Sequence, residues 1–106
     1  MIVDPESVTV ELVTVEVERV VKRLDTMPTA KADDDVCSLV QDRAARIVAL
    51  THDPHRPADW QLPILGPTAL AAQLRLVVQD YLDKRTAASE DAAVAEILID
   101  LRRSLP

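Results

Sequence analysis

The residues best suited to chemistry lie near the middle of the chain. His52 and His55 are three positions apart, and Asp59 follows closely. Imidazole and carboxylate groups bind zinc and other divalent ions, so the 52–60 segment is a candidate site for a metal or a small ligand. Pro54 separates the two histidines in a stretch without helical periodicity, so the spacing does not place both rings on one face. We therefore favour no metal site, and we keep a metal or small-ligand site at His52, His55 and Asp59 as the alternative hypothesis.

The other reactive side chains lack the neighbours that catalysis requires. Cys37 is the only cysteine, and the aspartates at 33–35 oppose the helix-dipole effect that would activate its thiol. These aspartates lack the ligand spacing and the glycine of a calcium loop. Gly66 is the only glycine, which excludes the glycine-rich phosphate-binding loops. We therefore expect a protein that is not an enzyme and that needs no cofactor.

The segment 52–66 also carries the only tryptophan, Trp60, within a run of apolar residues that extends to Leu65. A loop of about 15 residues is long for a small domain, and such loops are often functional or mobile. Its apolar residues either cover one end of the protein as a lid or contact a ligand or partner, because tryptophan is enriched at binding hot spots. The candidate contact residues are Trp60, Leu62 and Ile64.

The charge of the chain limits its partners. Its 106 residues include 18 acidic and 12 basic ones, a formal net charge of −6. Proteins that bind nucleic acids or anionic membranes usually carry an excess of basic residues. This chain does not, so we expect neither as a partner. No apolar run approaches the roughly 20 residues of a membrane span, and the first residues lack the pattern of a signal peptide. We therefore expect a cytoplasmic protein.

Four segments show the apolar spacing of amphipathic helices. Asp4, one of the aspartates at 33–35, and Ser89 are the expected N-caps of the first, second and fourth segments. The chain length suits one domain. We therefore predict an all-α fold in which residues 1–106 form a single helical domain, a small four-helix bundle with a long Pro-rich loop at 52–66. The expected helices are approximately 5–25, 34–51, 67–84 and 89–105.

The lengths of the connections predict which helices are neighbours. The 28–33 and 85–89 connections are short, so the first and second helices, and the third and fourth, should form adjacent antiparallel pairs. The long loop frees the second and third helices from being immediate antiparallel neighbours.

The first segment also admits a β-strand interpretation. Residues 8–21 are rich in valine and threonine, whose branched side chains favour strands. The alternation of apolar residues changes phase between Leu12 and Val13, however, and the chain offers no second strand to pair with. We therefore predict a helix.

This first helix has apolar residues on two faces when its residues are placed at about 100° intervals. A helix at the edge of a bundle needs only one apolar face. Either the helix is central in the bundle, or the second face contacts another copy of the chain about a two-fold axis. We expect a homodimer, and a non-catalytic regulator or adaptor that acts through protein contacts. Its expected interaction surface combines Val8, Leu12 and Val15 with Trp60, Leu62 and Ile64.

Overall fold

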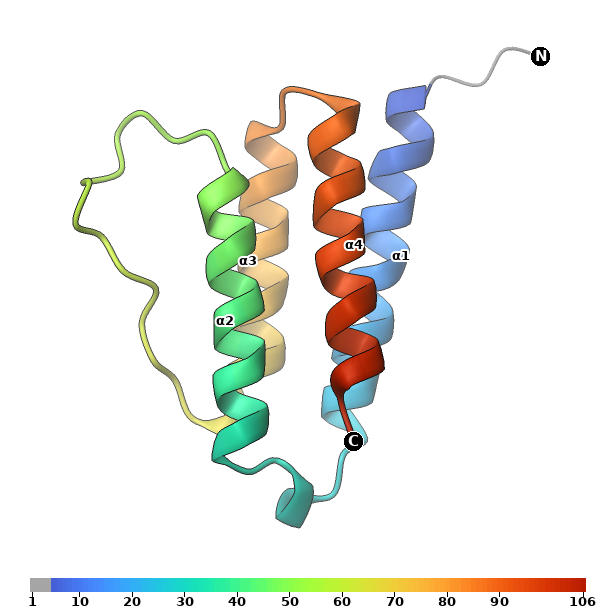
Figure 1. The fold of residues 1–106 in the computed structure, drawn as a ribbon, viewed down its shortest axis with the longest axis vertical. Coiled ribbons are helices and arrows are strands. Elements are labelled where there is room, and N and C mark those ends of the chain that lie inside the picture. The colour runs from blue at the N-terminus through green and yellow to red at the C-terminus, as the bar shows by residue number, and fades with distance from the viewer. Residues whose placement is uncertain (1–4) are drawn as a thin grey trace.

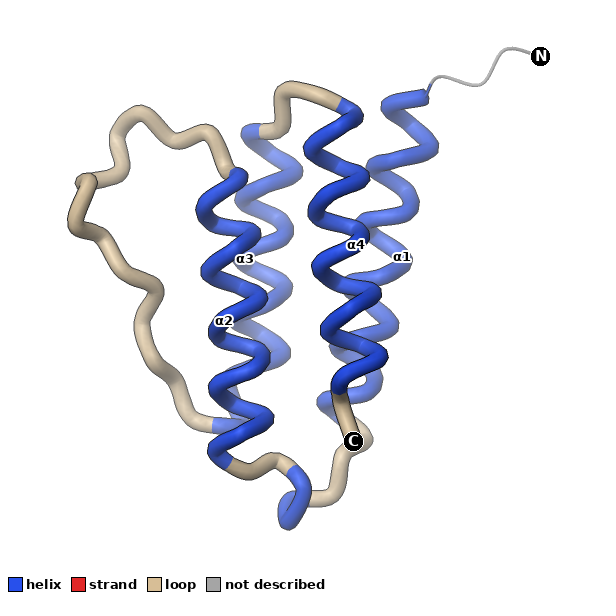
Figure 2. Tube along the Cα trace, viewed as in Figure 1, coloured by secondary structure: helices blue, strands red, loops and turns tan. Residues whose placement is uncertain are grey.

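The computed structural model describes residues 5–106, which form four α-helices around one core (Figure 1). No strand is present in this described part (Figure 2), so the predicted all-α bundle is confirmed and the strand interpretation of residues 8–21 is wrong. The expected N-cap Asp4 lies outside the described residues. The helices are α1 (Pro5–Asp25), α2 (Asp34–Leu50), α3 (Leu70–Lys84) and α4 (Ala88–Ser104), with short 3₁₀ turns η1 (Thr29–Lys31) and η2 (Pro67–Ala69).

The start of α2 follows the predicted capping chemistry. The Asp33 side chain accepts a hydrogen bond of 3.0 Å from the backbone N–H of Val36, which satisfies one of the free amides of the first turn. Asp34 and Asp35 place negative charge at the positive end of the helix dipole. The helix ends at Leu50, one residue earlier than predicted.

The starts of the last two helices differ from the prediction. The expected third helix begins as the 3₁₀ turn η2, and α3 proper starts at Leu70. Ser89 does not cap α4, because the helix begins one residue earlier and its extended N-cap residue is Ala87. The amide of Asp91 makes the first helical hydrogen bond to the carbonyl of Ala87 at 3.3 Å, and the amide of Glu90 bonds to the same carbonyl at 3.2 Å. No side chain caps the helix.

The core is built from one face of each helix. The three- and four-residue spacing of the first segment predicts a main apolar face made of Val10, Val13, Val17, Val20, Val21 and Leu24. The structure buries Val13, Val17, Val20 and Val21 of this face. They belong to the same core cluster as apolar side chains from the other three helices. The largest fully buried side chains elsewhere are Val40 and Ile47 of α2, Leu70, Leu74, Val78 and Tyr81 of α3, and Val94, Leu98 and Leu101 of α4.

The directions of the helices differ from a simple up-and-down bundle. Figure 1 shows α2 and α3 running parallel to each other, and α1 and α4 running together in the opposite direction. Residues 51–66 therefore return the chain along the whole length of the bundle. We call this segment the strap.

The order of the helices around the core corrects the expected pairing. Helix α1 packs against α4 and α3, and α2 packs against α3 and α4, so the consecutive pairs α1/α2 and α3/α4 lie on the diagonals. A short connection limits only the distance between two helix ends. With neighbouring axes about 9 Å apart the diagonal is about 13 Å, which a few extended residues can span.

The strap is longer than its connecting task requires. Helix α2 has 17 residues, which makes it about 25 Å long, and a chain returning along it must cover a similar distance. Fully extended, residues 51–66 could reach about 50 Å. Half of the strap would therefore suffice for connectivity.

This topology predicts the effect of shortening the strap. Deletion of residues 53–64 leaves residues 51, 52, 65 and 66, whose reach of about 17 Å is too short to close the bundle within one chain. We expect two copies to exchange their α3–α4 halves, with retained helix content by circular dichroism.

Light scattering should give this deletion variant twice the molar mass of a control in which residues 53–64 become a Gly/Ser linker of equal length. A deletion variant with the mass of the control, or one that has lost its helices, would contradict the inferred topology.

Candidate functional site

The strap is anchored to the bundle near both of its ends. Near the start, the Arg56 guanidinium donates a hydrogen bond of 3.0 Å to the carbonyl of Val48 in α2. Near the other end, the buried side chain of Gln73 in α3 donates a bond of 2.8 Å to the carbonyl of Pro63. Gln41 of α2 in turn donates to the side-chain oxygen of Gln73. The strap is therefore held over the junction of α2 and α3.

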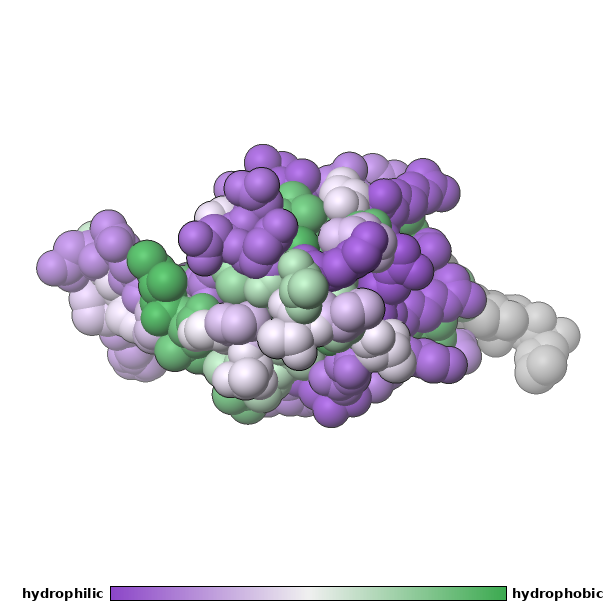
Figure 3. All heavy atoms as spheres, turned by 90° about the horizontal axis from the view of Figure 1, so that it is seen from below, coloured by the Kyte–Doolittle hydropathy of each residue, from purple (hydrophilic) through white to green (hydrophobic). Residues whose placement is uncertain are grey.

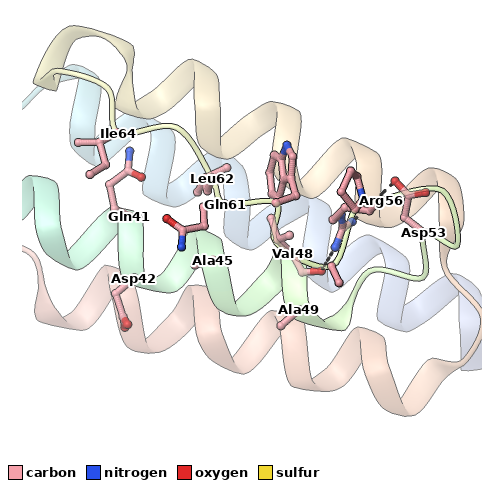
Figure 4. Close-up of a pocket in the computed structure, with 13 residues that line it drawn as sticks. Gln41, Asp42, Ala45, Val48, Ala49, Asp53, Arg56, Gln61, Leu62 and Ile64 are labelled. Carbon is pink, nitrogen blue, oxygen red and sulfur yellow. Dashed lines mark hydrogen bonds and ion pairs between the residues drawn. The ribbon is translucent and has the colours of Figure 1, made fainter.

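Two grooves flank the strap, each with a volume of about 680 Å³. The α2 groove lies between the strap and α2, and its helix side includes Gln41, Ala45, Val48 and Ala49 (Figure 4). The α3 groove lies between the strap and α3. Its apolar lining includes Trp60, Leu62 and Leu65 of the strap and Ala69, Ala72, Leu76 and Val77 from η2 and α3.

Trp60 lines both grooves and keeps 42% of its surface exposed. The guanidinium carbon of Arg56 lies 5.5 Å from the centre of the indole ring, within the range of a cation–π contact. Arg56 therefore contacts the Trp60 ring and also donates the hydrogen bond that anchors the strap to α2.

The strap does not cover an end of the bundle as a lid. Of its apolar residues, Leu62 packs against the core, whereas Ile64 is 90% exposed and Leu65 is 39% exposed. A connection between opposite ends of a bundle must run along its side, which keeps most of these residues out of the core. Figure 3 shows apolar surface on the strap side of the molecule.

Charged groups gather at one end of the α3 groove and compensate one another. Lys84 lies 3.1 Å from the Asp53 carboxylate and 2.8 Å from Asp80, and Arg56 lies 3.9 Å from Asp53. The hydrogen bond from Lys84 holds the pKa of Asp53 below its ordinary value. The bonds to Asp80 and Asp53 raise the pKa of Lys84.

The structure does not bring His52, His55 and Asp59 together as a metal site. The His52 ring lies 2.9 Å from the carboxylate of Glu90 at the start of α4, and this contact lowers the pKa of Glu90. His55 is exposed, and its backbone amide donates to Asp53. Among residues 5–106, no three or more His, Cys, Asp or Glu side chains are arranged to hold a metal ion.

The second apolar face of α1 is exposed to solvent. Val8 is 51% exposed, Leu12 40% and Val15 39%, although α1 packs against both α3 and α4. We call these three residues the α1 stripe. The interpretation that α1 is a central helix with both faces buried is therefore wrong.

A buried carboxylate in α4 is the main feature that the sequence did not reveal. Asp91 is fully buried and accepts hydrogen bonds from the Tyr81 hydroxyl at 2.7 Å, Thr9 at 2.8 Å and the Arg85 Nε at 2.9 Å. The network joins α1, α3 and α4 near the α3–α4 turn. In the sequence, only the lone Tyr81 points to such a network, because the hydroxyl of a buried tyrosine usually has a hydrogen-bond partner.

The pKa of Asp91 reflects two opposing effects. Burial alone would raise it, but the hydrogen bonds from Arg85, Tyr81 and Thr9 outweigh this and hold the pKa below its ordinary value. Burial and the hydrogen bond to Asp91 raise the pKa of Tyr81. The network is therefore built around an ionised carboxylate at neutral pH.

A second buried carboxylate links α1 to the end of α4. Glu16 is 3% exposed and lies 2.9 Å from Arg19 of its own helix and 3.2 Å from Arg102 of α4. Glu16 lies between the core face of α1 and the exposed α1 stripe, and its ion pair with Arg102 joins α1 to α4.

The Asp91 network predicts a pH-dependent loss of stability. Asp91→Asn removes the charge that compensates Arg85, and we expect it to lower the free energy of unfolding at pH 7 by about 3 kcal/mol. Because the folded pKa of Asp91 is lowered, its contribution is complete above the ordinary value of 3.8 and is lost as the pH falls through the folded value.

Urea unfolding of wild type and Asp91→Asn at pH 7 and near pH 2 would measure this difference. The exposed Glu96→Gln on the same helix is the control, for which we expect little change at either pH. An Asp91→Asn variant as stable as wild type at pH 7 would contradict the role given to the network.

No helix within the described residues is both long enough and apolar enough to cross a membrane. Comparison with protein-family models, with curated protein sequences and with solved structures finds no match for this chain. What the protein does must therefore be inferred from its own surfaces and side chains.

Proposed function

We propose that the protein is a non-catalytic adaptor or regulator that acts through protein contacts, beginning with a second copy of itself. The observation that carries this proposal is the exposure of the α1 stripe on a helix whose other face already fills the core. Such a protein would work in the cytoplasm, where the lone thiol of Cys37 stays reduced.

The spacing of the α1 stripe suits helix-on-helix packing. Val8, Leu12 and Val15 follow the four- and three-residue steps that align side chains along one side of a helix. The same row on a second copy is self-complementary about a two-fold axis. Burial of aliphatic side chains on both sides would supply the driving force for association.

Charged residues border the stripe. Glu11 and Lys22 of α1 are both exposed. A polar rim around an apolar centre is typical of protein interfaces.

The position of the strap supports an adaptor role. Figure 1 shows the strap and α1 on opposite sides of the bundle. A dimer formed through the α1 stripe would therefore leave both straps accessible, each with its exposed Trp60 and Ile64. Such a dimer could present two equivalent surfaces to protein partners.

This proposal predicts the effect of a charge placed in the α1 stripe. Leu12→Glu should convert a dimer into a monomer at tens of micromolar, because the interface would have to bury an unpaired carboxylate. The helix content should not change, since Leu12 is 40% exposed in the single chain. Light scattering and circular dichroism measure the two properties.

Thr14→Glu is the matched control, because it adds the same charge at an exposed position of α1 outside the stripe. We expect this variant to dimerise like wild type. A wild-type chain that is monomeric at tens of micromolar, or a Leu12→Glu variant that stays dimeric or unfolds, would refute the proposed interface.

A further inference from the structure

We propose that the α3 groove binds an uncharged, apolar small molecule between Trp60 and α3. This site is separate from the α1 stripe and goes beyond the proposed protein contacts. Its volume of about 680 Å³ lies within the roughly 300–1,000 Å³ that small-molecule sites usually have.

Small side chains line the groove on the side of α3. They are Ala69 of η2 and Ala72 of α3, and larger side chains there would take up part of its volume. Trp60 and Leu65 line the groove from the strap, and Leu76 lines it from α3. Most of the surface offered to a ligand is therefore aliphatic or aromatic.

The charged groups of the groove already have partners on the chain. Lys84 is bound by Asp53 and Asp80, and Arg56 contacts Asp53 and the Trp60 ring. These two cations and two carboxylates balance. A charged ligand would lose its own hydration without gaining a free counter-ion, which disfavours it relative to a neutral one.

The buried polar groups of the groove are also satisfied. Gln73 uses its amide nitrogen for the Pro63 carbonyl and its oxygen for Gln41. Within the described residues, no buried side-chain nitrogen or oxygen lacks a hydrogen-bond partner. The groove therefore offers a ligand apolar contact without an unpaired buried side-chain donor or acceptor, which is the chemistry that selects an uncharged, apolar molecule.

The length of the strap is consistent with such a site. About half of residues 51–66 would connect α2 to η2, and the full segment instead carries Trp60, Leu62 and Leu65 alongside the groove. The strap is thus both a connection and one wall of the site.

Three probes with the same ten-carbon chain test the assignment: decan-1-ol, decanoate and decylammonium. Trp60 is the only tryptophan and lines the groove, so its fluorescence reports binding directly. Below the concentrations at which the probes aggregate, we expect a saturable blue shift with decan-1-ol. Both charged probes should bind at least tenfold more weakly.

Two substitutions in the groove and two controls locate the binding site. Ala72→Leu adds bulk and Leu76→Glu adds a charge to the α3 side of the groove. Both positions are exposed, so the fold should tolerate the substitutions. Each should weaken decan-1-ol binding at least tenfold. Ala93→Leu, at an exposed position of α4, and Leu12→Glu, in the α1 stripe, should bind like wild type.

Several results would overturn the proposal. They are the absence of saturable binding, a preference for either charged probe, and Ala72→Leu binding as tightly as Ala93→Leu. Unfolding of both groove variants would show that these positions are not open as described. Loss of binding in Leu12→Glu alone would assign the probe to the α1 stripe, whereas a monomeric wild type that still binds decan-1-ol would refute only the proposed dimer.

Discussion

The parallel packing of α2 against α3 is the constraint on which the rest of the structure depends. Two consecutive helices can be parallel neighbours only if the chain between them returns along the full length of the bundle. Residues 51–66 do this on the outer side of the two helices (Figure 1). The position of Trp60, the exposure of Ile64 and the two grooves all follow from that path.

Two buried carboxylates help to fix the arrangement of α1, α3 and α4. Asp91 joins α4 to α1 and α3, and Glu16 joins α1 to Arg102 near the end of α4. Apolar faces alone would tolerate sliding or exchange of neighbours, because hydrophobic contact is not directional. A carboxylate without its partners would be costly to bury, so these networks favour one register of α1 against α4.

Local sequence patterns predicted the parts of the fold that depend on near neighbours. The three- and four-residue spacing of Val13, Val17 and Val20 identified α1 and its buried face, and Asp33 identified the start of α2. The diagonal placement of consecutive helices and the Thr9–Asp91 contact depend on residues far apart in sequence, which no local pattern encodes. The lid interpretation of the strap failed for the same reason, since it required the relative direction of α2 and α3.

The candidate binding surfaces, unlike the core, contribute little to the stability of the fold. Leu76 is 72% exposed and Ile64 90%, so neither contributes much to the burial that stabilises the bundle. Substitutions there, and in the half-exposed α1 stripe, should change binding more than folding. Helix α1 and the strap also lie on opposite sides of the bundle (Figure 1), so a partner bound at one would not have to displace a molecule bound at the other. The proposed self-association and the proposed ligand binding can therefore be tested separately by substitution, and any coupling between them would have to pass through the contacts of α1 with α3.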